Sequence, residues 1–208
     1  MKNKSWFILS LIIIVTVVVF FPALDGVYLN WDDNQQITNN QDVLNLSWQS
    51  IKNYFTSFYV ASYQPLASLS FGIEYYLFGE NSLVPHITNL LLHILNIILV
   101  YFLLRKITKN QFINFFIVGV FAIHPLQAEL LGWISTRSTL LYSSFFLISL
   151  IYYTKYISKK NQKYYWFTLL FFVLSLLSKA TAVIFPFLLL LFDYLYKRKF
   201  KLKVVLEK

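Results

Sequence analysis

Two neighbouring aspartates are the first side chains in this sequence that could do acid–base chemistry. Asp32 and Asp33 lie in the run Asn30-Trp31-Asp32-Asp33. Adjacent side chains of an extended segment point in opposite directions, so one carboxylate can face a site while the other caps a turn or binds backbone. A carboxylate in such a site could act as general base for a hydroxyl group. The simpler alternative is a solvated turn, and the two acids alone do not decide between these interpretations.

A third carboxylate, Glu129, follows the dipeptide His124-Pro125. Proline suits the first turn of a helix, which would place Glu129 about one turn inside it. A carboxylate beside apolar surface is unfavourable unless it is paired or used. The membrane-facing stripe of this helix would consist of Leu126, Leu130 and Trp133. In the alternative interpretation, Glu129 belongs to an interfacial helix and reaches water among the lipid headgroups.

Two cations, Arg137 and Lys179, each stand beside the start of an apolar block. The planar guanidinium of arginine suits phosphate oxygens, and a lysine adds a point charge. The alternative for each is an unspecific contact with lipid phosphates. An enzyme acting on a lipid phosphate would require Asp33, Glu129, Arg137 and Lys179 to converge on one cavity.

Four polar residues, His86, Asn89, His93 and Asn96, recur along one apolar block. At helical spacing they stay within about an 80° arc of one face, which should look into the bundle. The two histidines are ~10 Å apart along the helix axis and cannot share a metal ion. We expect them to form hydrogen bonds between helices rather than a functional site.

The elements that must position these side chains are membrane spans. Of the 208 residues, 58% are hydrophobic and only 13% are charged, whereas soluble domains carry roughly 25% charged residues. Each span needs ~20 apolar residues and should be a helix, because lipid offers no hydrogen-bond partners. We therefore expect an all-α polytopic membrane protein in a single domain, 1–208, with about six transmembrane helices. The expected spans are 6–24, 85–104, 112–123, 139–157, 166–178 and 180–196.

Three further expectations concern the spans and the loop 25–84. The run 6–24 exceeds the roughly 7–15 apolar residues of a signal peptide and should be a retained span. In the loop, Ser47 should cap one interfacial helix, and Pro65 should begin another with Leu66, Leu69, Ile73 and Leu77 at helical spacing. The last two spans should be separated by a break near Ser178-Lys179, because one helix of that length would overshoot the bilayer.

The distribution of charge predicts the orientation. With a cytoplasmic N-terminus, all but three of the 18 basic residues fall in cytoplasmic segments, the exceptions being Lys52, Arg137 and Lys179. This agrees with the positive-inside rule and places the acidic residues above on the extracytoplasmic face. The net charge of +9 therefore reflects membrane topology, and we expect no nucleic-acid partner.

Several short motifs occur in an order that resembles one enzyme group. It is similar to the N-terminal membrane part of GT-C-fold glycosyltransferases that carry C-terminal tetratricopeptide repeats and act as protein O-mannosyltransferases. The motifs span about residues 25–196. They are Trp31-Asp32-Asp33, Tyr63-Gln64-Pro65-Leu66, the run from His86 to His93, His124-Pro125 with Glu129, Ser135-Thr136-Arg137-Ser138, and Leu177-Ser178-Lys179 with Pro186 and Asp193.

The resemblance implies transfer of a sugar from a polyprenyl-phosphate carrier to an acceptor hydroxyl of a protein or glycan, without a nucleotide cofactor. It implies that Asp32 or Asp33 is the base, that Glu129 assists, and that Arg137 and Lys179 lie near the lipid phosphate. His124, Tyr63 and Gln64 would support the site, and a divalent metal could take part. The chain departs from the group at Gln64, where a basic residue is common, and near Thr139, where an acid is common. GT-C enzymes also have more spans, so we expect an incomplete module.

The leading hypothesis is a GT-C glycosyltransferase that acts on the extracytoplasmic face and uses a polyprenyl-phosphate sugar as donor. One alternative is a non-catalytic membrane subunit that binds lipid-linked sugar or scaffolds a partner. Another is a small transporter or flippase. Transporters of protons or ions place ionisable residues near mid-membrane, and the apolar blocks contain few.

Overall fold

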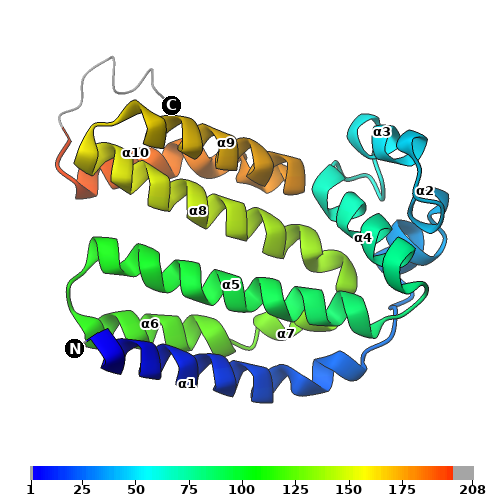
Figure 1. Ribbon diagram of the computed structural model, residues 1–208, viewed down its shortest axis with the longest axis horizontal. Helices are drawn as coiled ribbons and strands as arrows, with labels where there is room; N and C mark the ends of the chain where they lie inside the picture. Colours follow the sequence, from blue (N-terminus) through cyan, green and yellow to red (C-terminus); the bar gives the residue numbers. More distant parts are fainter. Residues whose placement is uncertain (1, 199–208) are drawn as a thin grey trace.

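The computed structural model describes residues 2–198 as a bundle of helices (Figure 1). Its long elements are α1 (Lys2–Phe20), α5 (Leu83–Ile107), α6 (Gln111–Ile123), α8 (Arg137–Lys159), α9 (Gln162–Ser178) and α10 (Phe185–Leu195). Within the described residues there is no strand, only an isolated bridge between Tyr59 and Ser62. The fold is therefore all-helical, as expected for a membrane protein of GT-C type.

Within residues 2–198, three stretches are long and apolar enough to cross a membrane, namely Lys4–Asp25, Leu83–Ile107 and Ile134–Lys159. The remaining expected spans are shorter helices. The 13 residues of α6 reach only ~20 Å at 1.5 Å per residue, less than the hydrocarbon thickness of ~30 Å. Six crossings therefore stay a prediction, although each expected span coincides with a helix.

The break expected near Ser178-Lys179 is confirmed. Helix α9 ends at Ser178, Lys179 is extended with φ −161° and ψ 133°, and the 3-10 turn η4 (Ala180–Ile184) leads into α10. Pro186 stands in the first turn of α10, where its missing N–H is not needed. The chain therefore reverses direction between α9 and α10 (Figure 1).

The loop 25–84 folds into short helices, as predicted. They are the π-helical turn η2 (Asn34–Thr38), α2 (Gln41–Leu44), α3 (Trp48–Thr56) and α4 (Pro65–Phe78). The hydroxyl of Ser47 accepts a hydrogen bond of 3.1 Å from the backbone N–H of Ser50 and so caps α3. Helix α4 buries Ala67 and Phe71 against Ile37, Val43, Tyr54 and Ile134. Part of its predicted apolar stripe faces away from the protein, since Ile73 and Leu77 are exposed.

The helices alternate in direction, so the connections gather at two ends (Figure 1). We call the end formed by the loop 25–84, α7 (Gln127–Gly132), η3 (Ile134–Thr136) and η4 the site end. The opposite end, formed by the start of α1 and the connections 108–110 and 160–161, is the basic end. The lysines at 199, 201, 203 and 208, which also entered the orientation argument, lie outside the described residues.

The polar stripe of α5 binds neighbouring segments, as expected. The side chain of Asn89 donates to the carbonyl oxygen of Ile134, and that of Asn96 donates to Leu140 at 3.1 Å. A ring nitrogen of His86 lies 2.9 Å from the carbonyl oxygen of Leu131, and one of His93 lies 2.9 Å from that of Ala122. All four side chains are buried. They join α5 to α6, α7, η3 and α8.

Candidate functional site

A cavity of about 210 Å³ lies at the site end. Its walls come from the first loop, from α7, from η3 and the first turn of α8, and from the residue between α9 and η4. The residues with polar side chains that matter for its chemistry are Asp32, Gln64, Glu129, Trp133, Thr139 and Lys179. Pockets for whole small-molecule ligands are roughly 300–1,000 Å³, so this cavity suits a headgroup or a sugar unit.

The two aspartates have different surroundings. Asp33 is fully buried, and its carboxylate accepts hydrogen bonds from the backbone N–H of Leu29 at 2.9 Å and from the N–H of Ser135 at 2.8 Å. The Ser135 hydroxyl donates to the same carboxylate. Asp32 is half-buried and lines the cavity. Asp33 is therefore the aspartate that binds backbone, and Asp32 is the one that lines the cavity, whereas a role of either in a functional site stays a prediction.

Glu129 lines the cavity from the first turn of α7, where its carboxylate is exposed. His124 does not line it. Its ring nitrogen Nδ1 accepts a hydrogen bond from the N–H of Leu126 at 3.2 Å, so it caps the approach to α7. The expected stripe of α7 is only partly right: Leu126 is exposed, whereas Trp133 is half-buried and lines the cavity.

Lys179 is the cation that reaches the cavity. Its ammonium donates a hydrogen bond of 2.8 Å to the hydroxyl of Thr139 in the first turn of α8.

Gln64 also lines the cavity, at the start of α4. Tyr63 does not line it, and its hydroxyl instead donates to the carbonyl oxygen of Phe55 at 3.1 Å. Val60 lines the cavity with φ 51°, a strained conformation for a β-branched residue.

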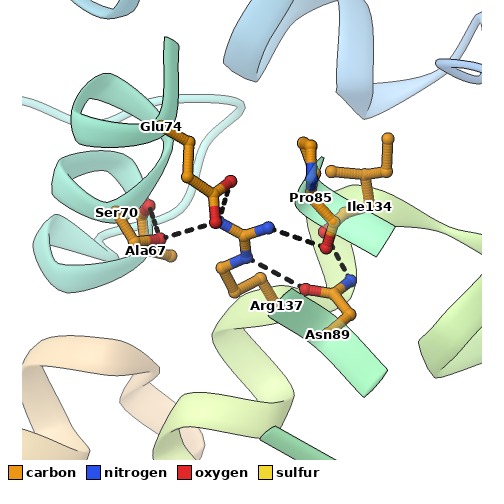
Figure 2. Close-up of polar contacts among 7 residues, drawn as sticks. All are labelled: Ala67, Ser70, Glu74, Pro85, Asn89, Ile134 and Arg137. Carbon is orange, nitrogen blue, oxygen red and sulfur yellow. Dashed lines mark hydrogen bonds and ion pairs between the residues drawn. The ribbon is translucent and has the colours of Figure 1, made fainter. Parts of the chain in front are cut away.

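Arg137 does not lie in the cavity, contrary to its expected contact with the lipid phosphate. Its side chain is fully buried, and its guanidinium donates to the carboxylate of Glu74 at 2.6 Å, to Asn89 at 2.9 Å and to the carbonyl oxygen of Pro85 at 2.9 Å (Figure 2). It also donates to Ser70 and stacks on Phe71, with 4.3 Å from its Cζ to the ring centroid. Arginine's several donors are thus used to join α4, α5 and α8.

The convergence required of Asp33, Glu129, Arg137 and Lys179 is not met by all four, because only Glu129 and Lys179 line the cavity. Glu129 and Lys179 share the cavity, Asp32 takes the place expected of Asp33, and Arg137 lies outside it. Sequence reasoning missed two partners, Glu74 and Ser135, because each meets its partner across the fold. Among residues 2–198, no group of three or more histidine, aspartate or glutamate side chains could hold a metal ion.

The sequence was compared with known proteins. The family model of dolichyl-phosphate-mannose-protein mannosyltransferases matches residues 60–206, which is more than half of the chain. The chain belongs to this family. The GT-C O-mannosyltransferase resemblance is thereby confirmed, and the integral-membrane character agrees with it. The matched region includes Gln64, Glu129 and Lys179, whereas Asp32 precedes it.

Several relatives of this mannosyltransferase family member are protein O-mannosyl-transferases. Human TMTC1 is 31% identical over 143 residues, which cover 64% of this chain and 16% of the relative. Human TMTC4 is 28% identical over 225 residues, covering 93% of this chain and 30% of the relative. The Caenorhabditis elegans protein F38B6.6 is 26% identical over 213 residues, covering 95% and 30%. The chain therefore spans less than a third of the length of these relatives, and no solved structure matches it.

Proposed function

We propose that this chain transfers a sugar from a polyprenyl-phosphate carrier to an acceptor hydroxyl of a protein or glycan. The observation that carries the proposal is the grouping of Asp32, Glu129 and Lys179 around one cavity. The names of the relatives support O-mannosyl transfer to protein, and mannose is accordingly the sugar we propose. A nucleotide cofactor has no part in this reaction.

In the proposed reaction, the acceptor oxygen attacks the anomeric carbon of the sugar while the bond from that carbon to the phosphate oxygen breaks. Asp32 takes the proton of the hydroxyl as general base. The electron pair leaves with the lipid phosphate, whose negative charge Lys179 stabilises. Glu129 orients the acceptor hydroxyl. Asp33 and Arg137 act indirectly, as positioning residues: Asp33 holds the first loop against η3, and Arg137 holds α4 against α5 and α8.

The proposal places the site end on the extracytoplasmic face. The connections 108–110 and 160–161 and the residues beside them are rich in lysine and arginine. In Figure 1 these connections lie at the basic end, opposite the site end. Membrane proteins retain such connections in the cytoplasm. We therefore propose six crossings, a cytoplasmic N-terminus, and a cavity that opens at the level of the outer lipid headgroups.

The proposal is tested by a transfer assay in proteoliposomes containing radiolabelled polyprenyl-phosphate mannose and a serine- and threonine-containing peptide. We expect labelled peptide with the wild-type chain and a rate roughly 100- to 10,000-fold lower with Asp32→Asn, because the general base is lost. Asp32→Asn should still bind the lipid and melt at the wild-type temperature. Asp33→Asn should lower the melting temperature, since Asp33 is buried and bound to Ser135.

Three outcomes would contradict the proposal. Undiminished transfer by Asp32→Asn would exclude this residue as the base. Binding of the lipid-linked sugar by a wild-type chain that forms no product would indicate a non-catalytic subunit. Movement of the lipid between leaflets without covalent product would indicate a flippase.

A further inference from the structure

The side chain of Gln64 is a buried donor without a partner. Gln64 is only 4% exposed, and its amide nitrogen Nε2 has no hydrogen-bond partner among residues 2–198. Its backbone carbonyl accepts from the N–H groups of Ala67 and Ser68, so the backbone is fixed at the start of α4. The side chain forms no cap there and instead lines the cavity. A buried amide left unpaired is unfavourable, which indicates that a ligand completes it.

A second donor of this kind belongs to Trp133. Its indole nitrogen Nε1 is buried and has no hydrogen-bond partner in the described part of the chain, and the residue lines the same cavity. The ring of Trp31 packs edge-to-face against it, with 5.4 Å between centroids. The indole N–H can only donate, so its natural partner is an oxygen atom of a ligand in the cavity.

The charges around the cavity indicate which oxygen atoms these donors meet. Lys179 contacts the first turn of α8 through Thr139, so its charge adds to the positive N-terminal end of that helix. This cationic wall suits a phosphate. Asp32 and Glu129 would repel an anion, but they can accept hydrogen bonds from hydroxyl groups. Two neutral N–H donors and two carboxylates around one cavity complement a polyol, because each hydroxyl both donates and accepts.

We infer that Gln64 and Trp133 bind hydroxyl oxygens of the transferred sugar and give the site its preference for a glycosylated lipid phosphate over a bare one. This inference rests on the proposed function and assigns the recognition of the sugar within it. Lys179 then recognises the phosphate that both lipids share. Gln64 and Trp133 contribute to affinity only when the lipid carries its sugar.

The experiment measures the dissociation constants of polyprenyl-phosphate mannose and of polyprenyl phosphate for the 208-residue chain in detergent. The variants are Gln64→Leu and Trp133→Phe, which remove one donor each while preserving most of the side-chain volume. Gln127→Leu, a buried glutamine of α7, and Trp48→Phe, an exposed tryptophan of α3, serve as matched controls, because neither residue lines the cavity. Each cavity variant should reduce the preference for the mannosylated lipid about fivefold, as loss of one hydrogen bond predicts. Both should bind bare polyprenyl phosphate as the wild type does, which also reports that they are folded.

An equal loss of both lipids in Gln64→Leu and Trp133→Phe would place these donors on the phosphate and overturn the inference. An unchanged preference in the cavity variants would overturn it as well. A wild-type chain that binds neither lipid would instead refute the proposed function.

Discussion

At the scale of single residues, the Arg137 guanidinium forms hydrogen bonds that join α8 to α4 and α5 at the site end. It is fully buried and paired with Glu74, whose side chain is 14% exposed. The attraction between such partners gains strength where water is excluded, but removal of one partner leaves the other charged and unpaired. Arg137 therefore joins α4, α5 and α8 and does not line the cavity.

Arg137→Met should lower the free energy of unfolding by about 3–5 kcal/mol, because Glu74, Asn89 and the Pro85 carbonyl lose their donor. Unfolding in mixed micelles titrated with dodecyl sulfate measures the change. Lys52→Met, which removes an exposed lysine of the same loop, is the matched control and should have almost no effect. Arg137→Met/Glu74→Met should recover part of the loss. If Arg137→Met left the stability unchanged and weakened the binding of polyprenyl phosphate, Arg137 would instead be assigned to binding of the lipid phosphate.

The residue types of the site were predictable from the sequence, but their roles depend on contacts between distant segments. A pair of adjacent aspartates predicts that one faces inward, yet only the contact of Asp33 with Ser135, 102 residues away, shows which one. In the same way, a cation at the start of a span could contact lipid. Arg137 instead pairs with Glu74, which is 63 residues away in the sequence. No local sequence pattern predicts a contact over that separation.

At the scale of elements, the small helices of the first loop are joined through Asp42. Its carboxylate accepts from Asn53 at 2.9 Å and from the hydroxyl of Tyr59 at 2.6 Å, and its backbone carbonyl accepts from Tyr54. Burial, with the nearby Asp42 carboxylate, raises the pKa of both tyrosines. Burial, with Glu80 and Glu74, raises the pKa of Tyr28 to about 12. All three phenols stay neutral at physiological pH, and those of Tyr54 and Tyr59 keep donating to Asp42.

The raised pKa values predict how the stability of this loop depends on pH. A group whose pKa is higher in the folded state contributes its full stability below its unfolded pKa, about 10 for tyrosine, and loses it as pH rises beyond that value. The melting temperature should therefore stay level from about pH 7 to 9 and fall above pH 10. Tyr59→Phe removes one of the titrating groups and should show a shallower fall. An equal fall of the melting temperature in this variant and in the wild type would show that ionisation of Tyr59 does not contribute to the loss of stability.

Local sequence signals predicted where the helices begin and end, but they did not predict which helix faces are buried. The Ser47 cap, Pro65 and the interruption at Lys179 act within one turn of the chain, and each structural element they predicted is present. The buried face of α4 was not predicted. Its small residue Ala67 and aromatic Phe71 pack inward against the loop, whereas Ile73 and Leu77 face out, because the bilayer surface also accepts apolar side chains.

At the scale of the whole molecule, the alternating helices separate two kinds of polar group. The cavity lies at the site end, and the connections rich in lysine and arginine lie at the basic end (Figure 1). If the bundle crosses the membrane as proposed, this separation places the lipid phosphate of the outer leaflet beside Lys179. The sequence contains no cysteine, so a single introduced thiol reports the exposure of one position without any background.

The most direct test of this account labels Ser62→Cys, which lines the cavity, with a membrane-impermeant maleimide in sealed, right-side-out vesicles. Lys160→Cys at the basic end is the control. We predict that Ser62→Cys reacts in intact vesicles and is protected by polyprenyl-phosphate mannose, and that Lys160→Cys reacts only after permeabilisation. Labelling of Lys160→Cys but not of Ser62→Cys in intact vesicles would contradict the orientation. Labelling of Ser62→Cys that the lipid-linked sugar leaves unchanged would contradict the cavity as its binding site.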